Sequence, residues 1–338
     1  FTAVSQLDAQ SPELFGTAWF QSAADAVVPA DSGVCSTESV GDFNDDGFED
    51  YAVGSCNSLN GRGQVRIIYG GSRFDSIRRV DTSTPLSNDI TQIVYRGNEA
   101  AHFGASVTGG YDINGDGIDD MAVGAPDGNG GDGAAYVIYG RRTPDARIDL
   151  GWTVPGGGSL GHHGGIYLPS SRGGDSEAES DDLGAVVNMF PNPRDPRRGA
   201  LIVTDPGNDN TLNSCDGAAY NCGTAWILTR PPFQSDGSGP WNSRSAQVPS
   251  LSLFAGDAQD DGMFPYGCRV DGSGSLAEFG ASADGGPDVT GDGVPDMVFG
   301  APAPDDSTDD GHAFAISGQA CMDRTRTANT SRCEDSDT

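Results

Sequence analysis

The sequence predicts an all-β fold, a β-propeller made of four-stranded antiparallel blades. Three observations lead to this prediction: a composition rich in turn-forming residues, a recurring acidic motif, and short alternating apolar runs after each copy of the motif. With 50 glycines and 20 prolines among 338 residues, the chain suits many short elements joined by turns. No convincing amphipathic helix is visible between these elements.

The acidic motif has the form D-x-[NT]-x-D-G-x-x-D. It occurs as "DFNDDGFED" at residues 42–50, "DINGDGIDD" at 112–120 and "DVTGDGVPD" at 288–296. Each copy runs into an apolar stretch that ends in glycine, followed by a second alternating stretch: "QVRIIYG", "AAYVIYG" or "HAFAISG". Alternation and β-branched residues predict two strands after each motif.

The motifs belong to longer repeats that begin with a Phe-Gly pair, at residues 15–16, 103–104 and 279–280. A fourth, eroded copy has Leu183 and Gly184 at the pair, and "ALIVTDPG" in place of "MAVGAPDG". Repeats of this length, which bury a core only against their neighbours, predict an array or a propeller. We expect one domain over 1–318, with units at about 15–97, 103–169, 183–256 and 279–318, and a polar tail at 319–338.

Each unit is expected to hold four strands, the outer one preceding the next Phe-Gly pair, as in "ITQIVYRG" (90–97) and "SLSLFAG" (250–256). The last unit ends after its third strand, near Gly318. The segment 1–8 stands where an outer strand belongs, so it completes the last blade and closes a ring, or is donated to a neighbouring chain. A five-bladed ring that uses residues 264–271 in an eroded blade is left open.

The acidic motif has the spacing of a calcium loop. Ca²⁺ takes six to eight oxygen ligands, and positions 1, 3, 5 and 9 of the motif carry oxygen-bearing side chains. Glycine at position 6 permits the sharp turn, and position 7 supplies a backbone carbonyl while its side chain turns to the core. Position 12 is apolar in every copy, which excludes an EF-hand. The alternative is an acidic hairpin turn without metal.

Charge and cysteine content limit the environment. A net charge of -30 argues against nucleic acid or an anionic membrane as partner and suits a protein that holds divalent cations. No apolar stretch is long enough to enter a membrane. The seven cysteines indicate an exported, extracellular protein. Their spacing suggests the pairs Cys35–Cys56, Cys215–Cys222 and Cys321–Cys333, with Cys268 left over.

Together these residues resemble the FG-GAP repeat of integrin α-subunit-type β-propellers. The resemblance covers the Phe-Gly pair, the acidic loop, the "VGAP"-like strand and the "YVIYG"-like strand, and is complete over 103–140. It implies about three calcium ions in loops on one face of a propeller. The ligands it implies are Asp42, Asn44, Asp46, the Phe48 carbonyl and Asp50; Asp112, Asn114, Asp116, the Ile118 carbonyl and Asp120; and Asp288, Thr290, Asp292, the Val294 carbonyl and Asp296.

The sequence also departs from that family. Integrin-type rings have seven blades, whereas four units are recognisable in this chain. The eroded unit has "NMFPNPRDPRRGA" (188–200) in place of the acidic loop, and we expect no ion there. Arg197 or Arg198 either supplies the missing positive charge or is solvated.

Catalytic patterns are poor, and we predict no enzyme. The "GGSLG" match at 157–161 lies in a glycine-rich loop beside His162 and His163, without the strand and helix that a nucleophile elbow needs. The first hypothesis is an extracellular calcium-binding propeller for adhesion or structural assembly, with a protein or a second copy as partner. The alternatives are a lectin-like carbohydrate binder and, third, a propeller-fold hydrolase or lyase.

Overall fold

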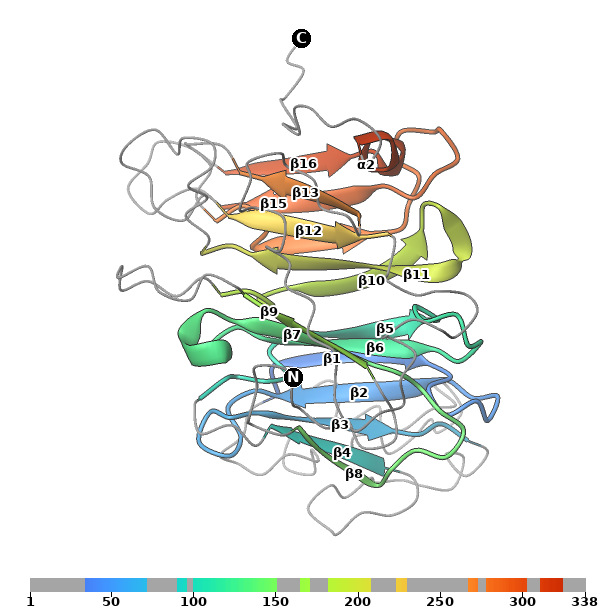
Figure 1. Ribbon diagram of the computed structural model, residues 1–338, viewed down its shortest axis with the longest axis vertical. Coiled ribbons are helices and arrows are strands. Elements are labelled where there is room, and N and C mark those ends of the chain that lie inside the picture. Colours follow the sequence, from blue (N-terminus) through green and yellow to red (C-terminus); the bar gives the residue numbers. More distant parts are fainter. Residues whose placement is uncertain are drawn as a thin grey trace, which may run out of the picture.

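The structure is a computed structural model that describes residues 34–71, 90–95, 100–150, 165–170, 182–207, 223–229, 267–272, 278–302 and 311–324. Within these residues, strands form four sheets that follow one another in chain order along the long axis (Figure 1). The predicted all-β class, with mainly antiparallel sheets, is confirmed. Residues 1–8, 15–16 and 250–256, which carry several of the predictions above, lie outside the described ranges.

The first sheet holds five strands. β1 (Ser36–Gly41), β2 (Asp50–Ser55), β3 (Gln64–Ile68) and β4 (Ile90–Tyr95) pair antiparallel in this order. β8 (Arg147–Leu150), which comes much later in the chain, adds to β4 as a parallel fifth strand. The sequence did not predict this addition, because a parallel partner so distant along the chain leaves no local signal.

The second and third sheets have the expected number of strands, four. The outer strand of the third sheet, however, is formed by residues 267–271, which a fifth blade would have used, and not by the expected 250–256. The second pairs β5 (Val107–Tyr111), β6 (Asp120–Ala125), β7 (Ala134–Ile138) and β9 (Gly165–Pro169). Both middle strands are buried throughout, because the second sheet has neighbours on both faces. A short 3₁₀ turn, η2 (Asn129–Gly131), lies between β6 and β7.

The third sheet pairs β10 (Val187–Asn192), β11 (Asp195–Asp205), β12 (Thr224–Leu228) and β13 (Gly267–Asp271). The first two strands meet in a tight hairpin, with Asn192 opposite Asp195. This hairpin stands where the other sheets carry an acidic loop, so the eroded unit keeps its strands and loses only the loop.

The fourth sheet has three described strands, β14 (Ser282–Gly285), β15 (Met297–Ala301) and β16 (His312–Ile316). A short helix, α2 (Gly318–Arg324), follows in the segment that we expected to be a polar tail. β16 is largely exposed, whereas its counterparts β3, β7 and β12 are buried along their whole length.

Three apolar clusters fill the space between successive sheets. The cluster between the first and second sheets is built around Phe43, Ile67 and Phe103, and the next around Trp226. The third cluster, around Phe190 and Phe299, joins the last two sheets. The inner strands β1, β5, β10 and β14 each pack on the next. In the described ranges the first and last sheets share no such cluster, and ring closure stays a prediction.

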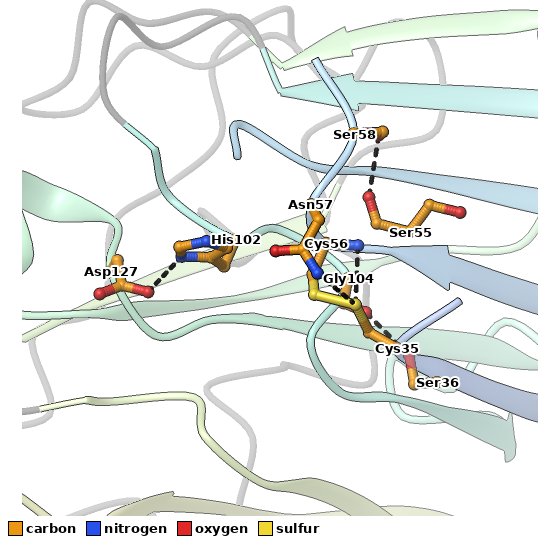
Figure 2. Close-up of a disulfide and its surroundings, with 9 residues drawn as sticks. All are labelled: Cys35, Ser36, Ser55, Cys56, Asn57, Ser58, His102, Gly104 and Asp127. Carbon is orange, nitrogen blue, oxygen red and sulfur yellow. Dashed lines mark hydrogen bonds and ion pairs between the residues drawn. A yellow bond between two sulfur atoms is a disulfide. The ribbon is translucent and has the colours of Figure 1, made fainter. Parts of the chain in front are cut away.

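Two disulfides connect described cysteines. Cys35–Cys56 is confirmed and ties the start of β1 to the end of β2, beside Gly104 of the next repeat (Figure 2). The second bond joins Cys268 of β13 to Cys321 of α2, so the expected pair Cys321–Cys333 and the expected spare Cys268 are both wrong. β13 and α2 come together only in the folded chain, which is why spacing pointed to a local pair. Cys215, Cys222 and Cys333 lie outside the described ranges.

None of the described helices is both long and apolar enough to cross a membrane.

Candidate metal centre

Three acidic loops join the first two strands of the first, second and fourth sheets. The first acidic loop (42–50) connects β1 to β2, the second (112–120) connects β5 to β6, and the third (288–296) connects β14 to β15. Since these sheets share one strand order, the loops occupy the same corner of each sheet. The structure describes every predicted ligand residue and gathers each set in a single turn.

The backbone of each loop turns around the carboxylate of the first residue of the loop. In the first acidic loop, Asp42 accepts hydrogen bonds from the backbone N–H of Asp46 and of Gly47, each at 2.8 Å. Asp112 accepts from Gly117 at 2.8 Å, and Asp288 from Gly293 at 2.8 Å. The donor is the glycine at position 6 in all three loops.

That glycine is required by the backbone. Gly47, Gly117 and Gly293 have φ values of 91°, 87° and 82°, in the left-handed region that side chains disfavour. No other heavy atom lies within 4 Å of a Cβ built there, so the restriction comes from the backbone and not from crowding.

Positions 3 and 5 are linked within each of the first two loops. Asn44 Oδ1 accepts from the N–H of Asp46 at 3.0 Å, and Asn44 Nδ2 donates to Asp46 Oδ2 at 3.0 Å. Asn114 and Asp116 repeat both contacts at 2.8 and 3.2 Å. The carboxylate at position 5 also accepts the N–H of position 7, for example from Phe48 at 3.0 Å.

The ninth residue is a buried carboxylate that joins the loop to the rest of its sheet. Asp120 is fully buried and accepts from the N–H groups of Ile113 at 2.9 Å, Asn114 at 3.1 Å and Gly140 at 2.9 Å. Asp50 is also fully buried and accepts from Phe43 and from Gly70. The glycine that follows the third strand thus holds the loop between the first two strands, a contact that the sequence analysis missed.

Burial and crowded negative charge perturb these carboxylates. Burial raises the pKa of Asp50 to about 7, and the charges of Asp46 and Asp42 push the pKa in the same direction, against the opposing hydrogen bonds. Burial raises the pKa of Asp120 well above its ordinary value, with the carboxylates of the same loop again adding to the shift. Each of these two loops therefore holds more negative charge than its surroundings stabilise.

The third acidic loop is more open. Asp296 is fully buried, but the rest of the predicted set, including Thr290, is mostly exposed. Burial would raise the pKa of Asp296, but hydrogen bonds from Thr290, Gly318 and Val289 outweigh it, and its pKa is lowered. The third loop therefore tolerates its negative charge better than the first two.

One expectation about the loops is wrong. We expected the side chain at position 7 to turn into the core, but Phe48 is 45% exposed, and Ile118 and Val294 are only half-buried. In the first two loops the second position does this instead, since Phe43 and Ile113 are 0% and 1% exposed, whereas Val289 of the third loop is 57% exposed. The backbone turn at the glycine of position 6 reverses the direction that simple alternation would give.

The neighbouring repeat reaches each of the first two loops. Asp119 Oδ2 accepts the N–H of Asp42 at 2.9 Å, which links the second loop to the first. The close approach needs Gly41, because a Cβ there would lie 2.1 Å from the Asp119 carboxylate. Arg142 pairs with Asp45 of the first loop.

The eroded unit adds a positive charge beside the second loop. The Arg198 guanidinium lies against Gly115, where an added Cβ would be 2.5 Å from either terminal nitrogen. Of the two arginines considered, Arg198 is thus the one placed at an acidic loop. The backbone N–H of Arg197 donates to Asp195.

The chemistry of the first two loops fits a hard cation. Their side-chain donors are all oxygens, on a turn that is already wound, with a backbone carbonyl at position 7. Within the described ranges, however, no three Asp, Glu, His or Cys side chains are grouped as a preformed metal cage. To coordinate an ion, the side chains at positions 3 and 5 would have to give up the hydrogen bonds that they make with each other.

Outside the loops, His102 contacts Asp127, and the pair joins the segment before Phe103 to the one after β6 (Figure 2). The predicted catalytic-looking stretch at 157–163 is outside the described ranges.

Comparison with known proteins gives both a family match and relatives. The family described as "FG-GAP repeat" matches residues 103–138. Integrin alpha-PS5 of Drosophila melanogaster is 35% identical over 117 residues, which are 33% of this chain and 10% of that protein. Integrin alpha-X of Mus musculus is 35% identical over 86 residues (25% and 7%), and integrin alpha-E of Mus musculus 30% over 119 residues (34% and 9%).

The chain therefore spans a tenth or less of the length of these relatives. The matched repeat holds the second acidic loop, β6 and β7, so the likeness covers the unit in which loop and strands are most regular. The chain thus contains a stretch that matches the FG-GAP repeat at residues 103–138, and it is similar to integrin alpha subunits over about a third of its length.

Proposed function

We propose that this chain is a non-enzymatic, extracellular, calcium-binding module that serves adhesion or structural assembly. The observation that carries the proposal is the shared hydrogen-bond pattern of the acidic loops, in which position 6 donates to position 1 and buried position 9 accepts from the backbone. The integrin relatives and the disulfides support the adhesive role and the extracellular location.

Calcium would be held by the ligand sets predicted from the sequence, one ion in each loop. It would supply the positive charge that the buried carboxylates of the first two loops call for. Because each loop joins two adjacent strands, an ion there would stabilise the folded sheet over the unfolded chain. The role of calcium is thus structural: it holds the corners of the sheets.

The partner is a protein surface or a second copy of this chain. The net charge of -30 excludes an acidic polymer as a favourable partner. Exposed carboxylates such as Asp46, Asp116 and Asp292 line the accessible side of the loops. Without an ion, these carboxylates repel one another and any acidic group that approaches. A bound ion would neutralise part of this charge, so that the surface of the loops accepts neutral or acidic groups.

Terbium luminescence tests the metal sites, because a tyrosine close to a bound lanthanide sensitises its emission. Tyr139 is buried near Asp120 and Asp116. Burial raises the pKa of Tyr139, and the negative charges of Asp120 and Asp116 raise it further. Tyr69 precedes Gly70, the donor to Asp50. In the third loop the residue that precedes the corresponding glycine is Ser317 and not a tyrosine, so we expect no sensitised emission from an ion bound there.

We expect saturable terbium emission that calcium reverses, and a loss of roughly half the emission in each of the variants Asp46→Ala and Asp116→Ala. Asp45→Asn is the matched control, since Asp45 sits in the first loop but pairs with Arg142. Emission that is absent, or equal in all four proteins, would remove the calcium proposal. Sedimentation with calcium and with chelator then tests whether assembly depends on the ion.

A further inference from the structure

The hairpin of the eroded unit lies against the second acidic loop. The turn between β10 and β11 is on the same side of the molecule as that loop (Figure 1). The backbone N–H of Gly199 donates to the carbonyl of Asp112, the first residue of the loop, at 3.0 Å. A Cβ on Gly199 would lie 2.8 Å from the Cβ of Tyr111, so this approach needs glycine. The backbone of the hairpin is therefore fixed to the loop.

Arg198, the residue before Gly199, places its guanidinium on this loop. A Cβ built on Gly115, the fourth residue of the loop, would lie 2.5 Å from both terminal nitrogens of Arg198 and 2.6 Å from the central carbon. The N–H of Gly115 itself donates to the carboxylate of Asp112. The guanidinium therefore contacts the part of the backbone that is hydrogen-bonded to the first predicted ligand.

The charge of Arg198 is only weakly compensated. Its carboxylate partner among the described residues is Asp195, at 3.9 Å between Nε and Oδ2, and the two side chains are 28% and 51% exposed. So long a contact between partly exposed groups neutralises little of the charge. The arginine at the first loop differs, because Arg142 pairs with Asp45, which lies outside the predicted ligand set. The positive charge of Arg198 is therefore available to act on the second loop.

A guanidinium and a metal ion are attracted by the same negative charges. The second loop carries four carboxylates, those of Asp112, Asp116, Asp119 and Asp120. A positive charge fixed beside them lowers the free energy of the empty loop, and it repels any cation that enters. Because Arg198 belongs to the chain and its backbone is held through Gly199, this charge is present whether or not an ion is bound.

We propose that Arg198 competes with calcium at the second acidic loop, so that it stabilises the metal-free loop and lowers the affinity of the loop for the ion. The inference rests on the calcium binding proposed above and adds that the eroded unit, which has no acidic loop of its own, sets the affinity of its neighbour. Coulomb's law for a divalent ion and one charge several ångströms apart, partly screened by water, gives roughly a five- to thirtyfold effect. The second loop should therefore fill after the first, which has five carboxylates.

Calcium displacement of terbium tests this proposal in the full chain. In an Asp46→Ala background, the remaining tyrosine-sensitised emission reports the second loop. We expect Arg198→Gln to raise the calcium affinity of that loop roughly five- to thirtyfold, and the difference to shrink at high salt. Arg197→Gln is the matched control, because it removes the same charge from the next residue, whose side chain is exposed. Arg198→Lys, which keeps the charge, should retain the affinity within about twofold.

The sign of the change separates this role from a merely structural one. If Arg198 only held the loop in shape, Arg198→Gln would loosen the loop and lower its affinity for calcium. An affinity that falls, or that equals the affinity of Arg197→Gln, would overturn the inference and leave the calcium proposal standing. Absence of terbium emission from the natural protein as well would remove both.

Thermal unfolding gives a second readout that does not depend on terbium. In excess chelator, Arg198→Gln should melt about 2–4 °C below Arg197→Gln, because the empty loop loses its compensating charge. In saturating calcium this gap should close, since tighter binding of the ion restores the lost stability. A gap of the same size in both conditions would show that Arg198 only supports the fold, and would overturn the inference.

Discussion

Replacing Asp120 with alanine tests whether the ninth residue of the loop stabilises the fold without any metal. The side chain is fully buried and accepts hydrogen bonds from three backbone N–H groups, those of Ile113, Asn114 and Gly140. Each buried donor left without an acceptor costs about 1–3 kcal/mol. Water entering the space recovers part of this, so we expect a loss of roughly 3–6 kcal/mol.

For a domain of this size, each kcal/mol lowers the melting temperature by about 2 °C, so Asp120→Ala should melt roughly 6–12 °C below the natural protein. Thermal unfolding is measured in excess chelator, which removes any contribution of bound ions. Asp116→Ala is the matched control, because Asp116 is exposed and lies in the same loop. If the two variants melt within about a degree of each other, the ninth carboxylate is only a ligand and the reasoning fails.

Three further predictions concern the contact between the second and third sheets, the charge of Asp50 and the second disulfide. Gly124→Ala places a Cβ 1.9 Å from the Gly184 carbonyl and should cost about 1–3 kcal/mol in denaturant unfolding, whereas an unchanged midpoint would mean that the two sheets shift apart at no cost. Asp50 binds its proton more tightly in the folded state (pKa about 7) than at its ordinary value of 3.8. Chelated protein should therefore lose stability as pH rises from about 4 to about 7, between the unfolded and the folded pKa of Asp50. Saturating calcium should reduce that loss, and Asp50→Asn should remove the Asp50 contribution. Cys268→Ser with Cys321→Ser should cost about 2–4 kcal/mol and open α2 to proteolysis first; resistance equal to the natural protein would show that α2 is held by packing alone.

Local features of the fold could be predicted from the sequence. The turn of each acidic loop depends on hydrogen bonds between residues at most five apart, such as the one from Gly47 to Asp42. The nine-residue motif is therefore enough to predict the turn. The strand runs after each loop alternate as half-buried strands do. The eroded unit was recognised for the same reason, because its strands kept their pattern when its loop was lost.

Features that depend on distant segments could not be predicted. Cys268 meets Cys321 because β13 and α2 pack together, and no spacing rule contains that contact. β8 joins β4 in parallel after the whole second motif has intervened. Phe48 is exposed because the turn at Gly47 overrides the alternation expected of an extended chain.

The hydrogen bond from the Asp42 N–H to Asp119 links the conformations of the first two acidic loops. Asp119 precedes the buried Asp120 of its own loop, so a change in the shape of the second loop is carried directly to the first residue of the first loop. Calcium bound at one of these two proposed sites would therefore alter the affinity of the other, and by thermodynamic linkage the factor would be the same in both directions. The eroded unit, whose hairpin replaces a loop, separates the third acidic loop from this pair. Calcium titration of the whole protein should therefore show two coupled binding events, at the first and second loops, and one independent event at the third loop.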